Sequence, residues 1–142
     1  MTAALAAAYR NAEIETVSQR DLLVRLYQGI ERFLDQGEAA MRSQKREQAT
    51  ISCQKARSIL FELLSTLNFE VGGEIAERLK QIYLFLISEI TECSLRKDAD
   101  RLHKIRPTLA ILRSAWEEIP AEFANVTSLT GADRNSLLDV RS

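Results

Sequence analysis

Residues 75–90 read Ile-Ala-Glu-Arg-Leu-Lys-Gln-Ile-Tyr-Leu-Phe-Leu-Ile-Ser-Glu-Ile, and this stretch decides the fold. Its apolar side chains recur at helical spacing, at Ile75, Leu79, Ile82, Tyr83, Leu86 and Ile90. Such spacing is typical of a helix that buries one face against other elements. Since neither glycine nor proline interrupts the stretch, it predicts one continuous helix rather than a strand.

Three further apolar stripes of the same kind occur along the chain. Their members are Leu23, Leu26, Tyr27, Ile30, Phe33, Leu34, Gly37 and Met41, then Ala49, Cys53, Ala56, Ile59, Leu60, Leu63, Leu64 and Leu67, and finally Leu102, Ile105, Leu109, Leu112 and Trp116. A capping-box-like segment, Ser18–Asp21, precedes the first stripe and predicts a helix start there. Polar or glycine-containing breaks separate the stripes at Ser43–Arg46, Gly72–Gly73 and Arg96–Asp98, where Asp98 is the expected N-cap.

Short connections make consecutive helices antiparallel neighbours. The sequence therefore predicts an all-α protein, an antiparallel up-down-up-down four-helix bundle formed by residues 18–119. Pro107 lies inside the fourth stripe, where it predicts a kink or a late helix start, because proline lacks the backbone donor that a helix interior needs. Residues 1–17 and 120–142 lose the periodicity, and we expect them to be flexible or loosely docked segments.

Composition excludes several classes of partner. The 142 residues include 19 Lys and Arg against 20 Asp and Glu, so the formal net charge is -1. Nucleic acids and anionic membranes need a net or clustered positive field, which this balance does not provide. The longest apolar run, Ile82–Ile87, is too short to cross a bilayer, and no secretory signal is visible. We expect a cytoplasmic protein in which Cys53 and Cys93 are small core residues.

The residues that catalysis requires are missing from the sequence. A di-metal bundle needs Glu-x-x-His on two helices, whereas this chain has one histidine, in Asp100-x-x-His103. His103 lies at the edge of its helix in projection, as expected of a solvated surface residue. No triad signature and no glycine-rich phosphate loop accompanies it. We therefore predict no enzymatic activity, no cofactor and no bound metal.

Several apolar residues fall outside the core stripes of their helices. In helical projection Leu84 and Phe85 lie about 140° and about 120° from Leu79, on opposite sides. Phe61 lies about 140° from the core line of its helix. Ile111 and Val24 are smaller cases in their own helices. A helix that is apolar on every side must bury more than its core face. Self-association, the chain's own tails, or an amphipathic segment of a partner could supply the cover.

A mid-chain motif is the most specific feature: Leu67-Asn-Phe-Glu-Val-Gly-Gly-Glu-Ile-Ala-x-x-Leu79, followed by Ile82-Tyr83-x-Phe85. In the matching order and spacing come Tyr9, Thr16-Val-Ser18, Leu26-Tyr27-x-Gly29, Asp98-Ala99 and Ala115-Trp116-Glu117. With these residues the chain resembles the flagellar secretion chaperones called FliS, from about Tyr9 to Trp116. It departs from the family pattern at Gln19, where proline is common, at Ser94-Leu95, at Pro107 and in the long tail beyond Pro120.

The resemblance implies a cytoplasmic chaperone that binds the disordered C-terminal region of flagellin, prevents premature polymerisation and aids export by the flagellar type III system. It also implies that an N-terminal tyrosine, here Tyr9, can lie over the apolar binding surface. The expected partner-binding residues are Tyr9, Phe61, Tyr83, Leu84, Phe85 and Ile111. Export apparatus components are possible further partners, and a monomer or weak homodimer is expected.

Two other hypotheses compete with parts of this interpretation. The bundle could be a structural module that dimerises through Phe61, Leu84 and Phe85, with no export client. Residues 132–140 form a weakly amphipathic segment with Leu137, Leu138 and Val140. Because a tethered segment meets its own groove at high effective concentration, this tail could occupy part of the client groove.

Overall fold

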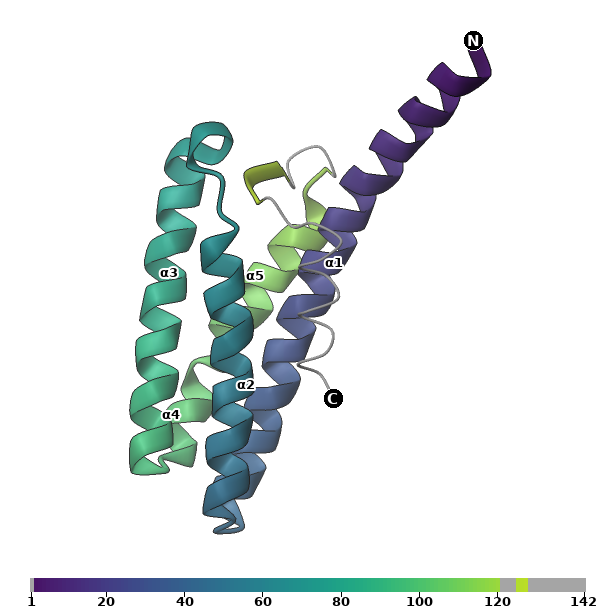
Figure 1. The fold of residues 1–142 in the computed structure, drawn as a ribbon. Coiled ribbons are helices and arrows are strands. Elements are labelled where there is room, and N and C mark those ends of the chain that lie inside the picture. The colour runs from purple at the N-terminus through teal and green to yellow at the C-terminus, as the bar shows by residue number, and fades with distance from the viewer. Residues whose placement is uncertain (1, 121–124, 128–142) are drawn as a thin grey trace.

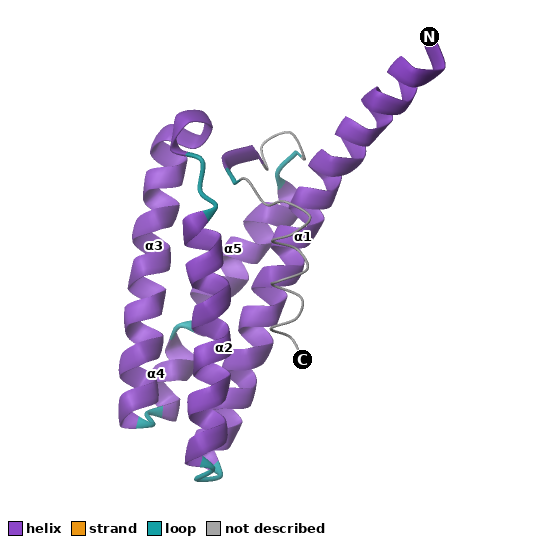
Figure 2. Ribbon diagram, in the orientation of Figure 1, coloured by secondary structure: helices purple, strands orange, loops and turns teal. Residues whose placement is uncertain are grey.

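The computed structural model describes residues 2–120 and 125–127, and it describes the side chains of residues 3–6, 19–120 and 125–127. It contains five helices: α1 (Thr2–Arg42), α2 (Arg46–Ser65), α3 (Phe69–Arg96), α4 (Ala99–Lys104) and α5 (Arg106–Glu118). The helices alternate in direction, and α4 and α5 together form the fourth member of the bundle (Figure 1). Short loops join them, and the described residues form no strand (Figure 2). The predicted four-helix bundle is therefore confirmed.

Proline divides the fourth helix, as predicted. α4 ends at Lys104, Ile105 links the two pieces, and Pro107 lies in the first turn of α5. A proline is tolerated there because the backbone donors of a first turn have no partner within the helix. Asp98 caps α4 as expected, since its side chain accepts a hydrogen bond from the backbone N–H of Arg101 at 3.1 Å.

The first helix begins earlier than predicted. α1 starts at Thr2 instead of Ser18, and its N-terminal part projects beyond the other helices (Figure 1). The segment before Ser18 is rich in alanine and contains neither glycine nor proline, so no residue in it stops the helix. A capping-box-like pattern is therefore not sufficient evidence of a helix start when good helix formers precede it.

The turn between α2 and α3 depends on Asn68 and Gly73. The Asn68 side chain accepts a hydrogen bond from the N–H of Val71 at 3.1 Å and so caps α3. Gly73 has φ 48° and ψ -120°, which interrupts the helical geometry four residues after α3 begins. Only glycine adopts such a conformation without strain, so the prediction of a helix stop and restart at this pair is correct for Gly73.

Side chains from the four stripes fill the core. Cys53 and Cys93 are buried free thiols within it, as predicted. At its centre Tyr27 and Tyr83 are hydrogen-bonded through their hydroxyls, and Nε1 of Trp116 donates to the Tyr27 hydroxyl at 3.1 Å. All three side chains are buried, so this network joins α1, α3 and α5 inside the bundle. A buried hydroxyl or indole N–H needs such a partner, because leaving it unpaired is costly.

Candidate partner-binding surface

Four of the residues expected to bind a partner are exposed on the outside of the bundle. The exposed fractions are 52% for Phe61, 42% for Leu84, 55% for Phe85 and 69% for Ile111. We call these four residues the apolar face. Because they come from α2, α3 and α5, only their positions in the folded bundle decide whether they form one surface.

Phe61 and Leu84 flank the seam between α2 and α3. Nη1 of Arg57 donates to Oγ1 of Thr91 at 3.0 Å, which identifies the sides of the two helices that face each other. Leu84 lies two turns before Thr91, on the same side of α3. Phe61 lies one turn after Arg57, on the same side of α2. In this antiparallel pair, Phe61 is level with Ile87 and so about 4.5 Å along the axis from Leu84.

Phe85 lies toward α4, and Ile111 lies on the side of α5 away from α1. Phe85 is one turn before Glu89, whose carboxylate accepts two hydrogen bonds from Arg101 of α4, at 3.0 and 2.6 Å. This places Phe85 on the side of α3 that faces α4. In α5, Nε of Arg113 donates a hydrogen bond to the carboxylate of Glu31 in α1 at 3.0 Å. Ile111, two residues earlier, lies on the opposite side of α5 and therefore points away from α1.

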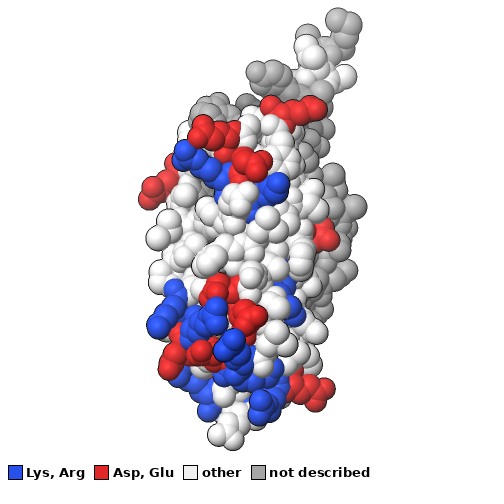
Figure 3. Space-filling view, turned by 90° about the vertical axis from the view of Figure 1, so that its left-hand side faces the viewer, with Lys and Arg blue, Asp and Glu red and all other residues white. Residues whose placement is uncertain are grey.

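The outer surface of α3 is uncharged at mid-height. Figure 3 looks onto this side of the molecule and shows a white band between two groups of charged side chains. Along α3, the Arg78–Glu74 and Lys80–Glu77 ion pairs lie before this band, and Glu89, paired with Arg101 of α4, lies after it. Because no charge has to be desolvated within the band, an apolar helix or chain segment can cover it at little cost.

Tyr83 is not part of this surface. It is completely buried, and its hydroxyl bonds to that of Tyr27. The expectation that Tyr83 contacts a partner is therefore wrong for the chain folded in this way, because its side chain points from α3 into the core. The side chain of Tyr9, the remaining candidate, lies outside the described residues.

The sequence reasoning missed a second exposed apolar group. Phe69, Val71 and Ile75, in the first turns of α3, are all exposed. Ile75 was expected on the core stripe, but its side chain is 59% exposed. In the register set by Arg57 and Thr91, the last residue of α2, Ser65, is level with Tyr83, so Ile75 lies about 12 Å beyond the end of α2. No periodicity within α3 signals this exposure, because it depends on where the neighbouring helix ends.

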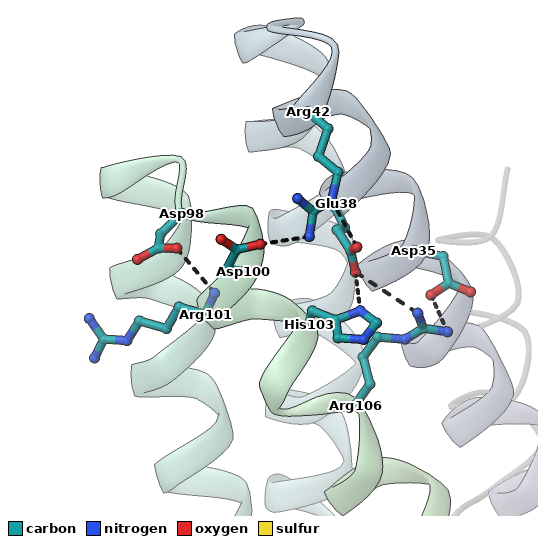
Figure 4. A network of polar contacts seen from close by, with 8 residues as sticks. All are labelled: Asp35, Glu38, Arg42, Asp98, Asp100, Arg101, His103 and Arg106. Atoms are coloured by element: carbon teal, nitrogen blue, oxygen red, sulfur yellow. Dashed lines mark hydrogen bonds and ion pairs between the residues drawn. The ribbon is translucent and has the colours of Figure 1, made fainter.

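A polar network links α4 and α5 to α1 and uses the chain's one histidine (Figure 4). Glu38 Oε1 lies 3.0 Å from Nδ1 of His103, and Glu38 Oε2 accepts from Nε of Arg42 at 3.1 Å. Partial burial by itself would raise the pKa of Glu38, but the bonds with His103 and Arg42 outweigh it and lower the pKa. Arg106 adds an ion pair to Asp35 at 2.6 Å. His103 is exposed, as expected, but it contributes to helix packing.

Neither a metal centre nor a membrane span is found in the described part of the chain. Residues 2–120 and 125–127 contain no group of three or more His, Cys, Asp or Glu side chains placed to hold a metal ion. None of the described helices combines the length and hydrophobicity that a membrane span requires.

Comparisons with known proteins agree with the resemblance. The sequence model of a family described as "Flagellar protein FliS" matches residues 1–122. The flagellar secretion chaperone FliS of Vibrio cholerae serotype O1 is 30% identical over 118 residues, which cover 83% of this chain and 87% of that protein. The flagellar secretion chaperone FliS of Campylobacter jejuni is 30% identical over 112 residues, 79% of this chain and 88% of the relative. FliSB of Pseudomonas aeruginosa, also a flagellar secretion chaperone, is 28% identical over 108 residues, which cover 76% of this chain and 86% of that protein.

Proposed function

The chain belongs to the FliS family of flagellar secretion chaperones, and from this premise we propose that its apolar face binds the C-terminal region of flagellin for export. The family is one of chaperones, in agreement with the prediction that the chain is not an enzyme. The observation that carries the proposal is the exposure of Phe61, Leu84 and Phe85 around the uncharged outer surface of α3.

The physical properties of such a client fit this surface. An amphipathic segment that is made to pack inside a filament would self-associate if its apolar side were left free in the cytosol. Covering that side prevents premature polymerisation, and a segment without fixed structure can wrap around a wide surface. The bundle supplies a rigid support, because the helices that carry the apolar face are anchored by buried stripes.

The remaining functional assignments follow from the same proposal. The chaperone acts in the cytoplasm, as a monomer or weak homodimer, and delivers its client to components of the flagellar type III export apparatus. Residues 18–119 form the chaperone domain, with residues 1–17 as a possible cap over the binding surface and residues 120–142 as a tail. The competing function is a structural module that dimerises through the same face.

Aspartate substitutions in the apolar face test the client site. Phe61→Asp and Phe85→Asp should each weaken binding of a flagellin C-terminal peptide by about tenfold to a hundredfold. Each removes an aromatic ring that the bound peptide would cover and introduces a charge that binding would have to desolvate. Helical content should remain that of the wild type, since both side chains are exposed in the free chain. Titration calorimetry measures the affinity, and circular dichroism measures the fold.

Leu95→Asp is the matched control. Leu95 is an exposed apolar residue of α3, with an exposed fraction of 72%, and lies near the C-terminal end of that helix, away from the apolar face. Its substitution should leave the peptide affinity unchanged. Normal binding by both phenylalanine variants would refute the site.

Sedimentation of the wild type separates the export chaperone from the dimerisation module. A dimerisation module would be dimeric without the peptide, and the two aspartate variants would be monomeric.

A second prediction concerns Tyr9 as a cap on the binding surface. Tyr9 belongs to the N-terminal part of α1, which projects beyond the other helices (Figure 1). A tyrosine can bury most of its ring while its hydroxyl stays in water, so it can compete with a client for an apolar surface. Tyr9→Ala, or deletion of residues 1–12, should therefore raise the affinity for the flagellin peptide several-fold without a large change in melting temperature. Leu5→Ala is the control, and loss of the fold on deletion would instead assign the segment a structural role.

A further inference from the structure

One part of the C-terminal tail is built into the fold. The chain leaves α5 at Ile119, whose carbonyl accepts a hydrogen bond from Nη1 of Arg20 at 2.9 Å. It returns at Asn125–Thr127 to the turn between α2 and α3. There the N–H of Asn68 donates to the carbonyl of Val126 at 2.8 Å, and Leu67 and Thr127 form an antiparallel β-bridge. The predicted loose tail is therefore docked at this point.

The docking position is a small apolar socket. Val126 and Thr127 are both buried, as are Leu67 and Ala76 beneath them. Gly72 makes the close approach possible, because a Cβ at this position would lie 3.1 Å from the Cβ of Val126. We call Leu67, Asn68, Gly72 and Ala76 the socket.

The socket recognises its occupant through features that many peptides share. It offers a backbone donor and a strand-like edge to an extended main chain, and a glycine-lined space to one β-branched side chain. Main-chain pairing of this kind gives affinity without requiring a particular sequence, and the side-chain space adds a preference. The exposed Phe69, Val71 and Ile75 lie next to it on α3, so a longer segment could continue onto apolar surface.

In the described part of the tail, Asn125–Thr127, two small side chains are buried. A contact of this size is weak between separate molecules. A tether changes this, because the tail meets the socket at an effective concentration in the millimolar range. A partner segment that makes further contacts outside the socket can therefore displace the tail.

We propose that the socket is a binding site for an extended peptide with a β-branched side chain, filled by Val126 and Thr127 in the free chain and vacated for an extended segment of the client. This inference rests on the proposed function for the identity of the client, but the existence of the site does not depend on it. The tail is then a built-in competitor that lowers the affinity for the client and reoccupies the socket after release.

The first experiment asks whether the socket accepts a peptide from solution. The probe is a fluorescent peptide with the sequence of residues 121–131, titrated into the full-length chain and into its Val126→Asp variant. The peptide should bind the variant at least about tenfold more tightly than the wild type, whose socket is filled by the tethered tail. A peptide that carries the same Val-to-Asp change should not bind either protein. Asn125→Asp is the matched control, since it adds the same charge at the exposed neighbouring residue.

The second experiment measures a flagellin C-terminal peptide on the same proteins. Val126→Asp should bind it about tenfold more tightly than the wild type and Asn125→Asp, because removal of the buried valine abolishes the competition. Val126→Ala should give a smaller change in the same direction. If the aspartate variant loses helical content, the alanine variant tests whether the tail and the peptide compete.

The outcomes separate the two proposals. If the tail peptide binds no variant, the socket is not an exchangeable site and the inference is wrong. If the tail peptide binds but flagellin affinity is the same in all variants, tail and client do not compete, and the regulatory part is overturned. If flagellin binds neither the wild type nor any variant while the tail peptide binds Val126→Asp, the proposed client is wrong and the socket remains.

Discussion

Replacing Trp116 by alanine should release α5 from α1 and lower the free energy of unfolding by about 3–5 kcal/mol. The buried side chains of α5 are Leu109 and Trp116, and Leu112 is partly buried against the core, so the indole is the largest apolar contact of this helix. The substitution removes this large apolar contact and the hydrogen bond to Tyr27. The other core side chains come mainly from α1, α2 and α3, so we expect the loss to be concentrated in α5.

Urea unfolding followed by circular dichroism measures the total loss, and hydrogen exchange localises it. Amides of α5 should lose protection first, while those of α2 and the second half of α3 keep theirs. Trp116→Phe should cost less, about 1–3 kcal/mol, because it keeps most of the ring and mainly leaves a hydroxyl of the tyrosine pair without its donor. Ile111→Ala, an exposed change in the same helix, is the control. A loss below about 1 kcal/mol for Trp116→Ala would contradict the anchoring role.

The bundle should lose stability steeply in alkaline solution. Burial raises the pKa of Tyr27 from 10.0 to about 12, against the opposing effect of its hydrogen bonds with Tyr83 and Trp116. Burial also raises the pKa of Tyr83 well above its usual value, and the neighbouring Tyr27 adds to this. The folded state therefore holds these protons more tightly than the unfolded state, so their contribution is complete below about pH 10 and is lost as the pH rises above it.

The size of the effect follows from the shift. A rise of two units in the pKa of Tyr27, at about 1.36 kcal/mol each, gives a loss of about 2.7 kcal/mol in the free energy of unfolding between about pH 10 and pH 12. Urea unfolding at a series of pH values measures it. The double variant Tyr27→Phe, Tyr83→Phe should be less stable than the wild type near neutral pH but should lose less on going to alkaline pH. If the two proteins lose stability in parallel, the tyrosine pair does not cause the alkaline unfolding.

The exposure of the apolar face was predictable from the sequence. Phe61, Leu84, Phe85 and Ile111 lie more than a right angle from their core stripes, and a residue at that angle cannot reach the core of its own bundle. That Phe61 lies beside Leu84 across the seam between α2 and α3, and that Phe85 faces α4, was not predictable. The period gives an angle about each helix axis, whereas the neighbour that each side faces depends on contacts such as Arg57 with Thr91 and Arg101 with Glu89.

Local sequence was sufficient to predict the helices, their antiparallel order, the break at Pro107 and the cap at Asp98, because these depend on periodicity and on backbone chemistry within a few residues. The packing of the folded chain was needed to show that Tyr83 pairs with Tyr27 in the core, that Ile75 is exposed, and that Val126 docks beside Gly72. Each of these depends on which distant segments meet. Such meetings are set by the packing of whole helices, and no local pattern in the sequence records them.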